Sequence, residues 1–339
     1  MAHNPAMQRT CIFDRARAIG FRLVLLVGCA TSAHADWISR TEAIMGTRCA
    51  VELWSDDAAK GEAGISSVFD DMKRIDHLMS TWKEDTEISL VNREAAKHPV
   101  KISEELFRLL QTSVKYSEIT HGAFDITYAS VGYLYDFRAH IHPDQKAIAQ
   151  ALPGINFRHM VLDPKKFTVY FMRPGMRIDL GGIAKGYSVD RGIEILRSQG
   201  FTRAMVNAGG DSRIIGDRFG KPWVVGIRDP DHEGKTFLKI PLVDAAFSTS
   251  GDYERFFEEN GVRYHHIIDP KTGDSARKCR SVTIISGNAT RTDALTKSVF
   301  VMGPEAGIKF IDTLPDVDAV AVAPDGKLYY SKNLAPPAE

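Results

Sequence analysis

The spacing of apolar residues in the first half of the chain predicts two amphipathic helices. Between residues 65 and 79, apolar residues recur every three or four positions, which places them on one helical face. A second helix is predicted to begin after Ser103, a good N-terminal cap, and to end at Gly122. Both helices are expected to serve packing. The polar segment 84–87 between them is predicted to be a loop.

Short apolar runs elsewhere in the chain predict strands. Runs at 160–162 and 168–172 flank a turn, and after about Pro174 strands alternate with helices. These later strands are predicted at 204–206, 224–227, 264–268 and 282–286, and the helices at 184–199 and 292–302. No internal repeat is visible. The mixture predicts one α+β body, for which two lobes with a cleft between them is one arrangement.

Composition narrows the class of protein. The 339 residues include 43 Lys+Arg and 43 Asp+Glu, and 44% are hydrophobic. A net charge of zero argues against a nucleic-acid-binding protein, which usually carries a basic excess. The lack of low-complexity tracts argues against disorder. Because no run of about 18 uninterrupted apolar residues occurs, no membrane-spanning helix is predicted.

Residues 1–35 have the layout of an export leader. Arginines come first, a short apolar stretch follows at 23–30, and Ala33-His34-Ala35 forms a small-residue cleavage signal. The prediction is a signal peptide and a periplasmic protein whose functional domain spans 36–334. The alternative is a lipoprotein leader ending before Cys29, which would be acylated and anchor the chain to a membrane. The apolar region before Cys29 is short for that alternative, so cleavage after Ala35 is preferred.

Two cysteines, Cys49 and Cys279, remain after removal of the leader in either case. In an oxidising compartment they could form one disulfide, but sequence does not show whether they meet. Cys49 lies in an apolar, strand-like run, which favours a buried and unreactive thiol. None of the cysteines has the spacing of a metal site.

Five segments contain more Gly, Asp, Thr and His than packing requires. They are Met45-Gly46-Thr47, the stretch 121–127, the stretch 179–186, the pair 248–253 with 265–273, and the stretch 292–297. Taken singly, each has an ordinary structural explanation, such as a tight turn before a helix. Together, the motifs DLGGIAKG at 179–186, NAGGD at 207–211, TSGDY at 249–253 and HIIDPKTG at 266–273 resemble one family, the ApbE-type FAD:protein FMN transferases. The resemblance extends from about residue 44 to about residue 304.

The resemblance implies a fold, an activity and partners. It implies a T-fold-like α+β fold that holds FAD in a cleft. Such proteins move the FMN half of FAD to a threonine hydroxyl of an acceptor protein and release AMP, with Mg²⁺ as the usual cation. The expected acceptor is an exported electron-transfer subunit.

The resemblance also implies the residues that bind the flavin nucleotide. Met45 and Trp82 match positions on the flavin side, and further contacts are implied at Ala123, Phe124, Asp125, Asp179, Gly181, Lys185, His266 and Ile268. The alternative for Trp82 is a core aromatic at the end of a helix. Physically, the Gly181-Gly182 turn can bring backbone close to a phosphate at a helix N-terminus.

Two basic side chains have candidate roles. A cation in the first turn of a helix is disfavoured by the helix dipole, so Lys185 is expected either to face a phosphate or to be a solvated surface lysine. His266 is the candidate base for the acceptor threonine, because histidine titrates near working pH. His265 is its neighbour in a strand-like run and is expected to point to the opposite face. Asp269 is expected either to orient His266 or to start a turn.

The metal site departs from the family pattern at one position. The resemblance implies Mg²⁺ held at Gly182, at Asp293 and at a threonine four residues later, where this chain has Lys297. Either Lys297 swings aside and Thr296 completes an oxygen site, or the Lys297 ammonium pairs with Asp293 in place of the cation. An ammonium ~4 Å from a dication is repelled by ~8 kcal/mol at an effective dielectric of about 20, so the two exclude each other. The metal is the working prediction, with Asp293 also counted as catalytic.

Three functions follow from this departure. The first is transfer of FMN to a threonine. The second is a binding or delivery protein for FAD that has lost transfer through the change to Lys297. The third is hydrolysis of FAD to FMN and AMP, with water in place of the threonine.

Overall fold

The structure is a computed structural model that describes residues 35–228 and 235–334. The predictions for the leader, including the alternatives at Cys29 and the cleavage signal up to residue 34, fall outside the described residues. In the described part of the chain, none of the helices combines the length and the hydropathy that crossing a membrane requires.

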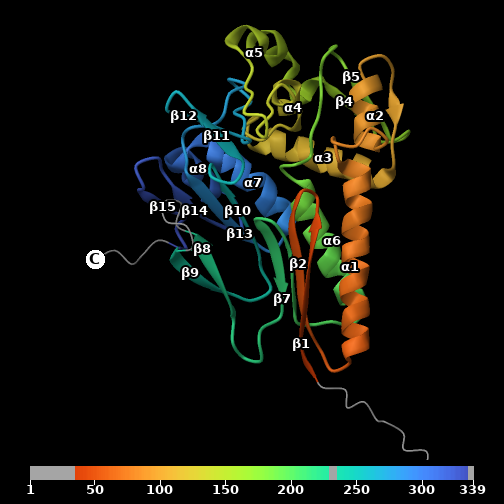
Figure 1. Ribbon diagram of the computed structural model, residues 1–339, viewed down its shortest axis with the longest axis vertical. Coiled ribbons are helices and arrows are strands. Elements are labelled where there is room, and N and C mark those ends of the chain that lie inside the picture. Colours follow the sequence, from red (N-terminus) through yellow and green to blue (C-terminus); the bar gives the residue numbers. More distant parts are fainter. Residues whose placement is uncertain (1–34, 229–234, 335–339) are drawn as a thin grey trace, which may run out of the picture. The chain divides into compact units, whose positions relative to one another are not determined.

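An eight-stranded antiparallel sheet forms the centre of the described chain (Figure 1). In spatial order its strands are β1 (Asp36–Ile44), β2 (Thr47–Ser55), β6 (Ala204–Ala208), β7 (Asp211–Ile215), β10 (Ala246–Gly251), β13 (Ser281–Ser286), β14 (Val317–Val322) and β15 (Leu328–Tyr330). Every neighbouring pair is antiparallel. The pairing of β2 with β6 joins two segments that are far apart in the sequence.

Long helices bury the apolar face of this sheet. They are α1 (Ala58–Met79), α6 (Ala184–Ser198) and α7 (Ala289–Met302), followed by the shorter α8 (Pro304–Ile311). Alternate residues of β2 are buried, as the two-residue period of a strand requires, and Val51 and Leu53 pack with Phe69 of α1 and Val189 of α6. The α1 and α6 helices lie along the sheet in Figure 1.

A second group of elements packs around a separate apolar cluster. It contains α2 (Glu87–Glu94), α3 (Glu104–Ile119), and a three-stranded sheet of β3 (Val100–Lys101), β5 (Thr168–Phe171) and β4 (Met160–Asp163). The short helices η1 (Ile126–Tyr128), α4 (Ala129–Gly132), α5 (Gln145–Ala151), η2 (Leu152–Gly154) and η3 (Phe157–His159) lie between α3 and β4 in the chain. Leu180 and Ile183 belong to this cluster, so the segment that leads into α6 is anchored in it.

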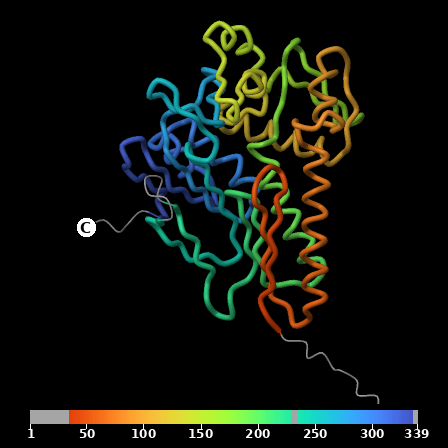
Figure 2. Tube along the Cα trace, viewed as in Figure 1, coloured from red at the N-terminus to blue at the C-terminus, as the bar shows by residue number. Residues whose placement is uncertain are grey.

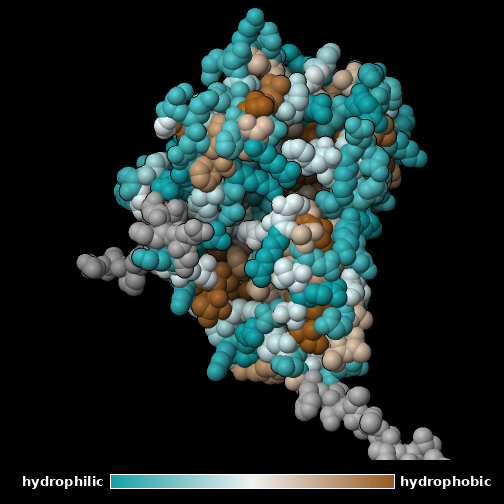
Figure 3. Space-filling model, in the orientation of Figure 1, coloured by the Kyte–Doolittle hydropathy of each residue, from teal (hydrophilic) through white to brown (hydrophobic). Residues whose placement is uncertain are grey.

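Two hairpins complete the described elements: β8 (Trp223–Arg228) with β9 (Thr236–Leu242), and β11 (Phe256–Glu259) with β12 (Val262–His265). On the face shown in Figure 3, the apolar residues of the described chain form small patches separated by hydrophilic ones.

The α+β class predicted from the sequence is confirmed. The helix at 65–79 is part of α1, and Ser103 caps α3 by accepting a hydrogen bond from the Leu106 main-chain N–H at 3.3 Å. The two lobes and the cleft between them stay a prediction.

Four features differ from the prediction. The α3 helix ends at Ile119 rather than at Gly122. The first half holds more than two helices, because α2 forms directly after the polar loop, where Thr86 caps it through the Ser89 N–H at 3.1 Å. The α7 helix begins at Ala289 rather than 292, because Asn288 caps it through the N–H of Arg291. The β12 strand ends at His265, so 266–268 lies beyond it.

The prediction for Cys49 is confirmed, because its thiol is fully buried and burial raises its pKa to about 11. Cys279 is also a buried, free thiol. The two cysteines belong to separate apolar clusters, so the disulfide alternative does not hold in this structure.

Candidate functional site

The tip of the β1–β2 hairpin forms one wall of the site. Met45 and Gly46 make a two-residue turn with φ angles of 55° and 66°, the left-handed pair that a type I′ turn requires. Arg255 donates from Nη2 to the carbonyl oxygen of Gly46 at 3.0 Å. Met45 packs against the cluster that contains Leu180, and Figure 2 shows the red tip beside the green segment that precedes α6. The motif Met45-Gly46-Thr47 therefore forms the turn between two strands.

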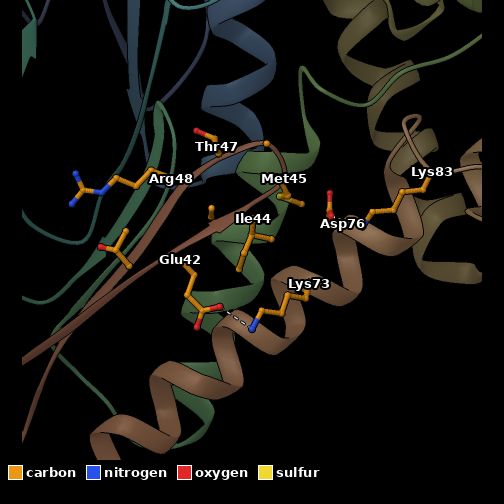
Figure 4. A pocket seen from close by; sticks show the side chains of 11 residues that line it. Glu42, Ile44, Met45, Thr47, Arg48, Lys73, Asp76 and Lys83 are labelled. Atoms are coloured by element: carbon orange, nitrogen blue, oxygen red, sulfur yellow. Dashed lines mark hydrogen bonds and ion pairs between the residues drawn. The ribbon is translucent and has the colours of Figure 1, made fainter.

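A pocket of about 570 Å³ lies between this hairpin and α1 (Figure 4). Its lining residues come from 41–48 of the hairpin together with Lys73, Asp76 and Lys83. Lys73 pairs with Glu42 at 2.8 Å, and Lys83 pairs with Asp76 at 2.6 Å. The charges around the pocket are thus largely balanced, and Met45 is part of its apolar wall.

Asp179 joins the end of α1 to the loop that precedes α6. Its Oδ2 accepts a hydrogen bond from the Thr81 hydroxyl at 2.7 Å. Its Oδ1 accepts from the Tyr128 hydroxyl at 2.9 Å and from the Gly181 N–H at 2.7 Å. These bonds fix the position of the glycine turn. The sequence motif indicated Asp179 but neither Thr81 nor Tyr128.

Trp82 lies next to this junction and is 85% exposed. The alternative that it is a core aromatic is therefore wrong. Its neighbour Thr81 binds Asp179, and the exposed indole is free to stack on a planar ring.

The stretch at 123–125 is buried beside the glycine turn. A Cβ added to Gly182 would lie 3.3 Å from the Phe124 ring, so the two segments are in contact. The Asp125 carboxylate accepts hydrogen bonds from the Thr127 N–H and hydroxyl and from the Phe157 N–H, at 2.8, 2.6 and 3.0 Å. Burial raises the pKa of Asp125, although these bonds oppose it. Asp125 thus supports the loop with its side chain.

Helices α6 and α7 cap each other. Asp293 of α7 accepts a hydrogen bond from the Gly186 N–H in the first turn of α6 at 3.0 Å. Asp190 of α6 accepts from the N–H groups of Ala289 and Thr290, at 2.9 and 2.8 Å, at the start of α7. Each carboxylate lies at a helix N-terminus, where the helix dipole favours a negative charge.

Only glycine fits at position 186. A Cβ there would lie 2.2 Å from the Ala289 carbonyl oxygen and 2.8 Å from the Asp293 Cβ. The sequence motif placed this glycine at the start of a helix, and the structure shows that it allows α6 and α7 to approach.

Four charged side chains meet at this crossing. Lys185 donates to Asp211 at 2.5 Å and lies 3.5 Å from Asp293 Oδ2, and Lys297 pairs with Asp293 Oδ1. The two aspartates are buried, and the lysine side chains are 23% and 17% exposed. The expected misfit of Lys185 at a helix N-terminus is thus relieved by carboxylates of the protein itself.

The charges of the cluster hold one another in place. Burial lowers the pKa of Lys185, but Asp211 and Asp293 outweigh it, so the net pKa is raised and the ammonium stays charged. Burial raises the pKa of Asp293, but Lys185 and Lys297 outweigh it, so the net pKa is lowered. Burial and the neighbouring Asp293 raise the pKa of Asp211, whose Oδ1 has no hydrogen-bond partner among the described residues.

Hydroxyl groups bind α7 to β10 on the other side of the helix. Ser250 donates to Thr296 at 2.9 Å, and Thr296 donates to the carbonyl oxygen of Asp293 at 2.8 Å. The hydroxyls of Ser248 and Thr292 are 2.7 Å apart. The TSGDY motif therefore anchors α7 through Ser250, together with Ser248 just before the motif.

The two neighbouring histidines have different surroundings. His265 is 3% exposed, lies 2.7 Å from the Ala276 carbonyl oxygen through Nε2, and has its pKa lowered to about 4, first by burial. His266 is half-buried, and its Nδ1 has no hydrogen-bond partner within the described chain. Burial, then His265 and Arg255, lower the pKa of His266 to about 3. Its imidazole is therefore neutral, and its Nδ1 is buried without a hydrogen-bond partner among the described residues.

The segment after His266 is a turn. Asp269 accepts a hydrogen bond from the Lys271 N–H at 2.9 Å through its carboxylate, and from the Gly273 N–H at 2.8 Å through its carbonyl. The alternative in which Asp269 starts the turn is thus confirmed. Ile268 is 6% exposed, and its main chain pairs with that of Ser275 in an isolated antiparallel β-bridge.

The model of the ApbE family matches residues 45–321. The chain belongs to the ApbE family. The FAD:protein FMN transferase of Treponema pallidum is 33% identical over 97% of this chain and 96% of that protein. An FAD:protein FMN transferase of Klebsiella pneumoniae is 32% identical over 84% of this chain and 88% of that protein.

Solved structures agree with this assignment. The crystal structure of the ApbE protein from Thermotoga maritima superposes with a TM-score of 0.82 at 34% identity, covering 88% of this chain and 98% of that chain. The flavin transferase ApbE from Vibrio cholerae superposes with a TM-score of 0.79 at 27% identity, covering the same shares.

The residues of this ApbE-family protein do not fit a divalent cation as they lie. Both oxygens of Asp293 already bind donors, because Lys297 pairs with Oδ1 and the Gly186 N–H with Oδ2. The Thr296 hydroxyl, the substitute ligand considered from the sequence, is turned toward Ser250 instead. Of the two alternatives at this position, the structure shows the pairing of Lys297 with Asp293.

The structure brings most of the predicted site residues into one region of the ApbE-family fold. Contacts link Phe124, Gly182 and Lys297, and hydrogen bonds link Asp179 to Gly181. Sequence reasoning missed four residues that shape this region: Thr81, Tyr128, Asp211 and Arg255. Only Asp211 lay within a quoted motif, as the last residue of NAGGD.

Proposed function

We propose that this protein is an FAD:protein FMN transferase, which moves FMN from FAD to a threonine hydroxyl of an acceptor protein. Its relatives from Treponema pallidum and Klebsiella pneumoniae bear this name, and they align with most of the chain. The family gives the class of reaction, and the arrangement of side chains supports it.

The observation that carries the proposal is a pair of ammonium groups beside a glycine turn. A Cβ added to Gly182 would lie 3.7 Å from Lys297 Cγ, so the lysine stem runs along the turn. Lys185 lies one turn away and is held by Asp211 and Asp293. Phosphoryl transfer depends on positioning and on stabilising charge, and two ammonium groups held beside the glycine turn can donate hydrogen bonds to a diphosphate.

The transfer needs one bond to form and one to break. The threonine oxygen attacks the phosphorus of the FMN half, and the bond from that phosphorus to the bridging oxygen breaks, so AMP leaves with that oxygen. The threonine proton goes to the imidazole of His266, which is neutral at working pH because its pKa is lowered. The negative diphosphate would raise the pKa of His266 toward the value that suits a base.

The Mg²⁺ implied by the resemblance would supply charge neutralisation at the diphosphate. The residues for it would be Gly182, Asp293 and Thr296. Because Lys297 pairs with Asp293, no step of the proposed reaction is assigned to a metal.

The location and the partner belong to the same proposal. The leader supports export to the periplasm, either as a soluble protein or as a lipoprotein anchored at Cys29. An acceptor in that compartment would be an exported electron-transfer subunit that presents a threonine.

The experiment combines the protein with FAD and a threonine-containing acceptor domain of such a subunit. Acceptor mass and AMP are followed together. An FMN-sized gain in mass with an equal amount of AMP supports transfer. AMP without the mass gain indicates hydrolysis, and FAD retained with neither product indicates a binding protein. An acceptor domain with the threonine replaced by valine is the matched control.

A further inference from the structure

We infer that the Lys297 ammonium takes the place of the divalent cation, so that this protein binds and cleaves FAD without Mg²⁺. The inference rests on the proposed function and concerns the source of positive charge at the diphosphate.

The first argument is position. The Lys297 stem lies against Gly182, with its Cγ and Cδ 3.7 and 3.9 Å from a Cβ placed there, and its Nζ pairs with Asp293. The ammonium therefore lies between the glycine turn and the carboxylate of α7. These are the two elements from which the sequence predicted metal ligands.

The second argument is charge. Lys185 and Lys297 carry two positive charges, and Asp211 and Asp293 carry two negative ones, so the cluster is neutral. The neutral cluster therefore has no excess of negative charge to attract a dication. An ammonium ~4 Å away repels a dication by ~8 kcal/mol at an effective dielectric of about 20, which cancels the attraction of one carboxylate at the same distance. With threonine at 297 the cluster would have one negative charge in excess and a hydroxyl beside Asp293, which are the conditions for an oxygen-ligated cation.

The third argument is that the neighbouring hydroxyl cannot compensate. Thr296 is fully buried, donates to the Asp293 carbonyl and accepts from Ser250, which keeps its hydroxyl on the β10 side of the helix. Asp293 could bind a metal only if Lys297 left its carboxylate. The Lys297 ammonium, which is largely buried, would then have no ion-pair partner.

An ammonium and a metal act differently on the diphosphate. The Lys297 ammonium donates up to three hydrogen bonds and carries one positive charge. A divalent ion instead coordinates oxygen atoms directly and carries two positive charges. The second charge is supplied here by Lys185. Neutralisation of the leaving AMP therefore depends on two side chains of the protein rather than on a cation from solution.

The test uses the full-length protein and three variants. Lys297→Thr restores the family residue, and Lys297→Met removes the charge without adding an oxygen. Lys309→Thr is the matched control, because Lys309 also pairs with an acidic residue four positions away, Glu305, but on an exposed surface. Thermal melting and circular dichroism verify that each variant folds.

Two readouts do not require activity. Mn²⁺ binding is measured by electron paramagnetic resonance, and FAD affinity is measured by flavin fluorescence with EDTA and with Mg²⁺. We expect the parent and the Lys309→Thr variant to show no saturable Mn²⁺ site and less than a twofold change in FAD affinity between EDTA and Mg²⁺. The Lys297→Thr variant should gain one Mn²⁺ site and bind FAD at least tenfold more tightly with Mg²⁺, while Lys297→Met should gain neither.

The third readout separates the inference from the proposed function. With the threonine-containing acceptor domain present, release of AMP from FAD by the parent should be unchanged in EDTA. A saturable Mn²⁺ site in the parent, or a tenfold loss of AMP release in EDTA, overturns the inference. No AMP release under any condition, with FAD bound equally in EDTA and Mg²⁺, overturns the proposed function and the cleavage part of the inference. Only the replacement of the cation by Lys297 in FAD binding then stands. If Lys297→Thr does not fold, the Mn²⁺ and EDTA results on the parent decide alone.

Discussion

The crossing of α6 and α7 gives the sharpest prediction about stability, through the change Gly186→Ala. The added methyl would lie 2.2 Å from the Ala289 carbonyl oxygen and 2.7 Å from its carbonyl carbon, both of them backbone atoms. Backbone cannot rotate away as a side chain can, so the helices must separate. Separation also lengthens the hydrogen bond from the Gly186 N–H to Asp293, now 3.0 Å.

The magnitude follows from three contributions. Overpacking costs about 1–3 kcal/mol. Loss of a hydrogen bond to a charged group costs about 1.5–3 kcal/mol. Alanine in place of glycine in a helix returns about 1 kcal/mol. The free energy of unfolding should therefore fall by about 1.5–5 kcal/mol, which corresponds to a melting temperature lower by about 3–10 °C at about 2 °C per kcal/mol for a chain of this size.

Denaturant and thermal unfolding measure this change, with Gly287→Ala as the matched control. A Cβ at Gly287 would have no atom within 4 Å, so that variant should stay within about 0.5 kcal/mol of the parent. The Gly186→Ala protein should also bind FAD more weakly, because Asp293 positions both lysines of the cluster. Equal stability of the two variants would refute the close approach of the helices.

Three further predictions concern single side chains. Trp82→Ala should weaken FAD binding about fivefold, or ~1 kcal/mol. Because the indole is 85% exposed, the free energy of unfolding should stay unchanged. Unchanged FAD affinity in a fluorescence titration would show that Trp82 is not part of the site. His265 has a pKa of about 4 in the native state, against 6.5 for an unperturbed histidine. Between these pH values the native state binds fewer protons than the unfolded state. The free energy of unfolding should therefore fall by up to about 3 kcal/mol as the pH drops from 6.5 to 4. His265→Gln should flatten this dependence in urea unfolding, and a parent slope retained in the variant would contradict the assignment. The third prediction uses a variant in which serine replaces the two leader cysteines. In it, neither Cys49 nor Cys279 should react with a thiol reagent at pH 8 until denaturant is added, because burial raises the pKa of both thiols. Rapid labelling of the native protein would contradict their burial.

Local patterns predicted the elements that their own residues determine. The apolar period of α1, the cap at Ser103 and the alternating run of β2 are each visible within about a dozen residues. The α2 helix was missed because it is short and buries only Ile88 and Val91, too few positions for a helical period to be recognised.

The site was predictable as a set of motifs but not as a set of contacts. Asp179 and Asp293 were identified from the resemblance, whereas their partners come from distant strands and loops. Asp211 reaches Lys185 only because β7 lies beside β6 and β10 in the sheet. The choice between metal and ammonium at Lys297 likewise depended on which way Thr296 turns, and that is decided by Ser250 on β10.

The order of strands in the large sheet has a consequence for how the protein matures. The β2 strand pairs with β6, and α7 at Ala289–Met302 contributes Asp293 and Lys297, so the region near the paired glycines is assembled from opposite ends of the chain. A polypeptide still emerging from the ribosome, or threading through a translocation channel, has no such region until residue 302 has arrived. If the chain crosses the membrane unfolded, it must therefore acquire its nucleotide on the far side, from whatever supply that compartment holds.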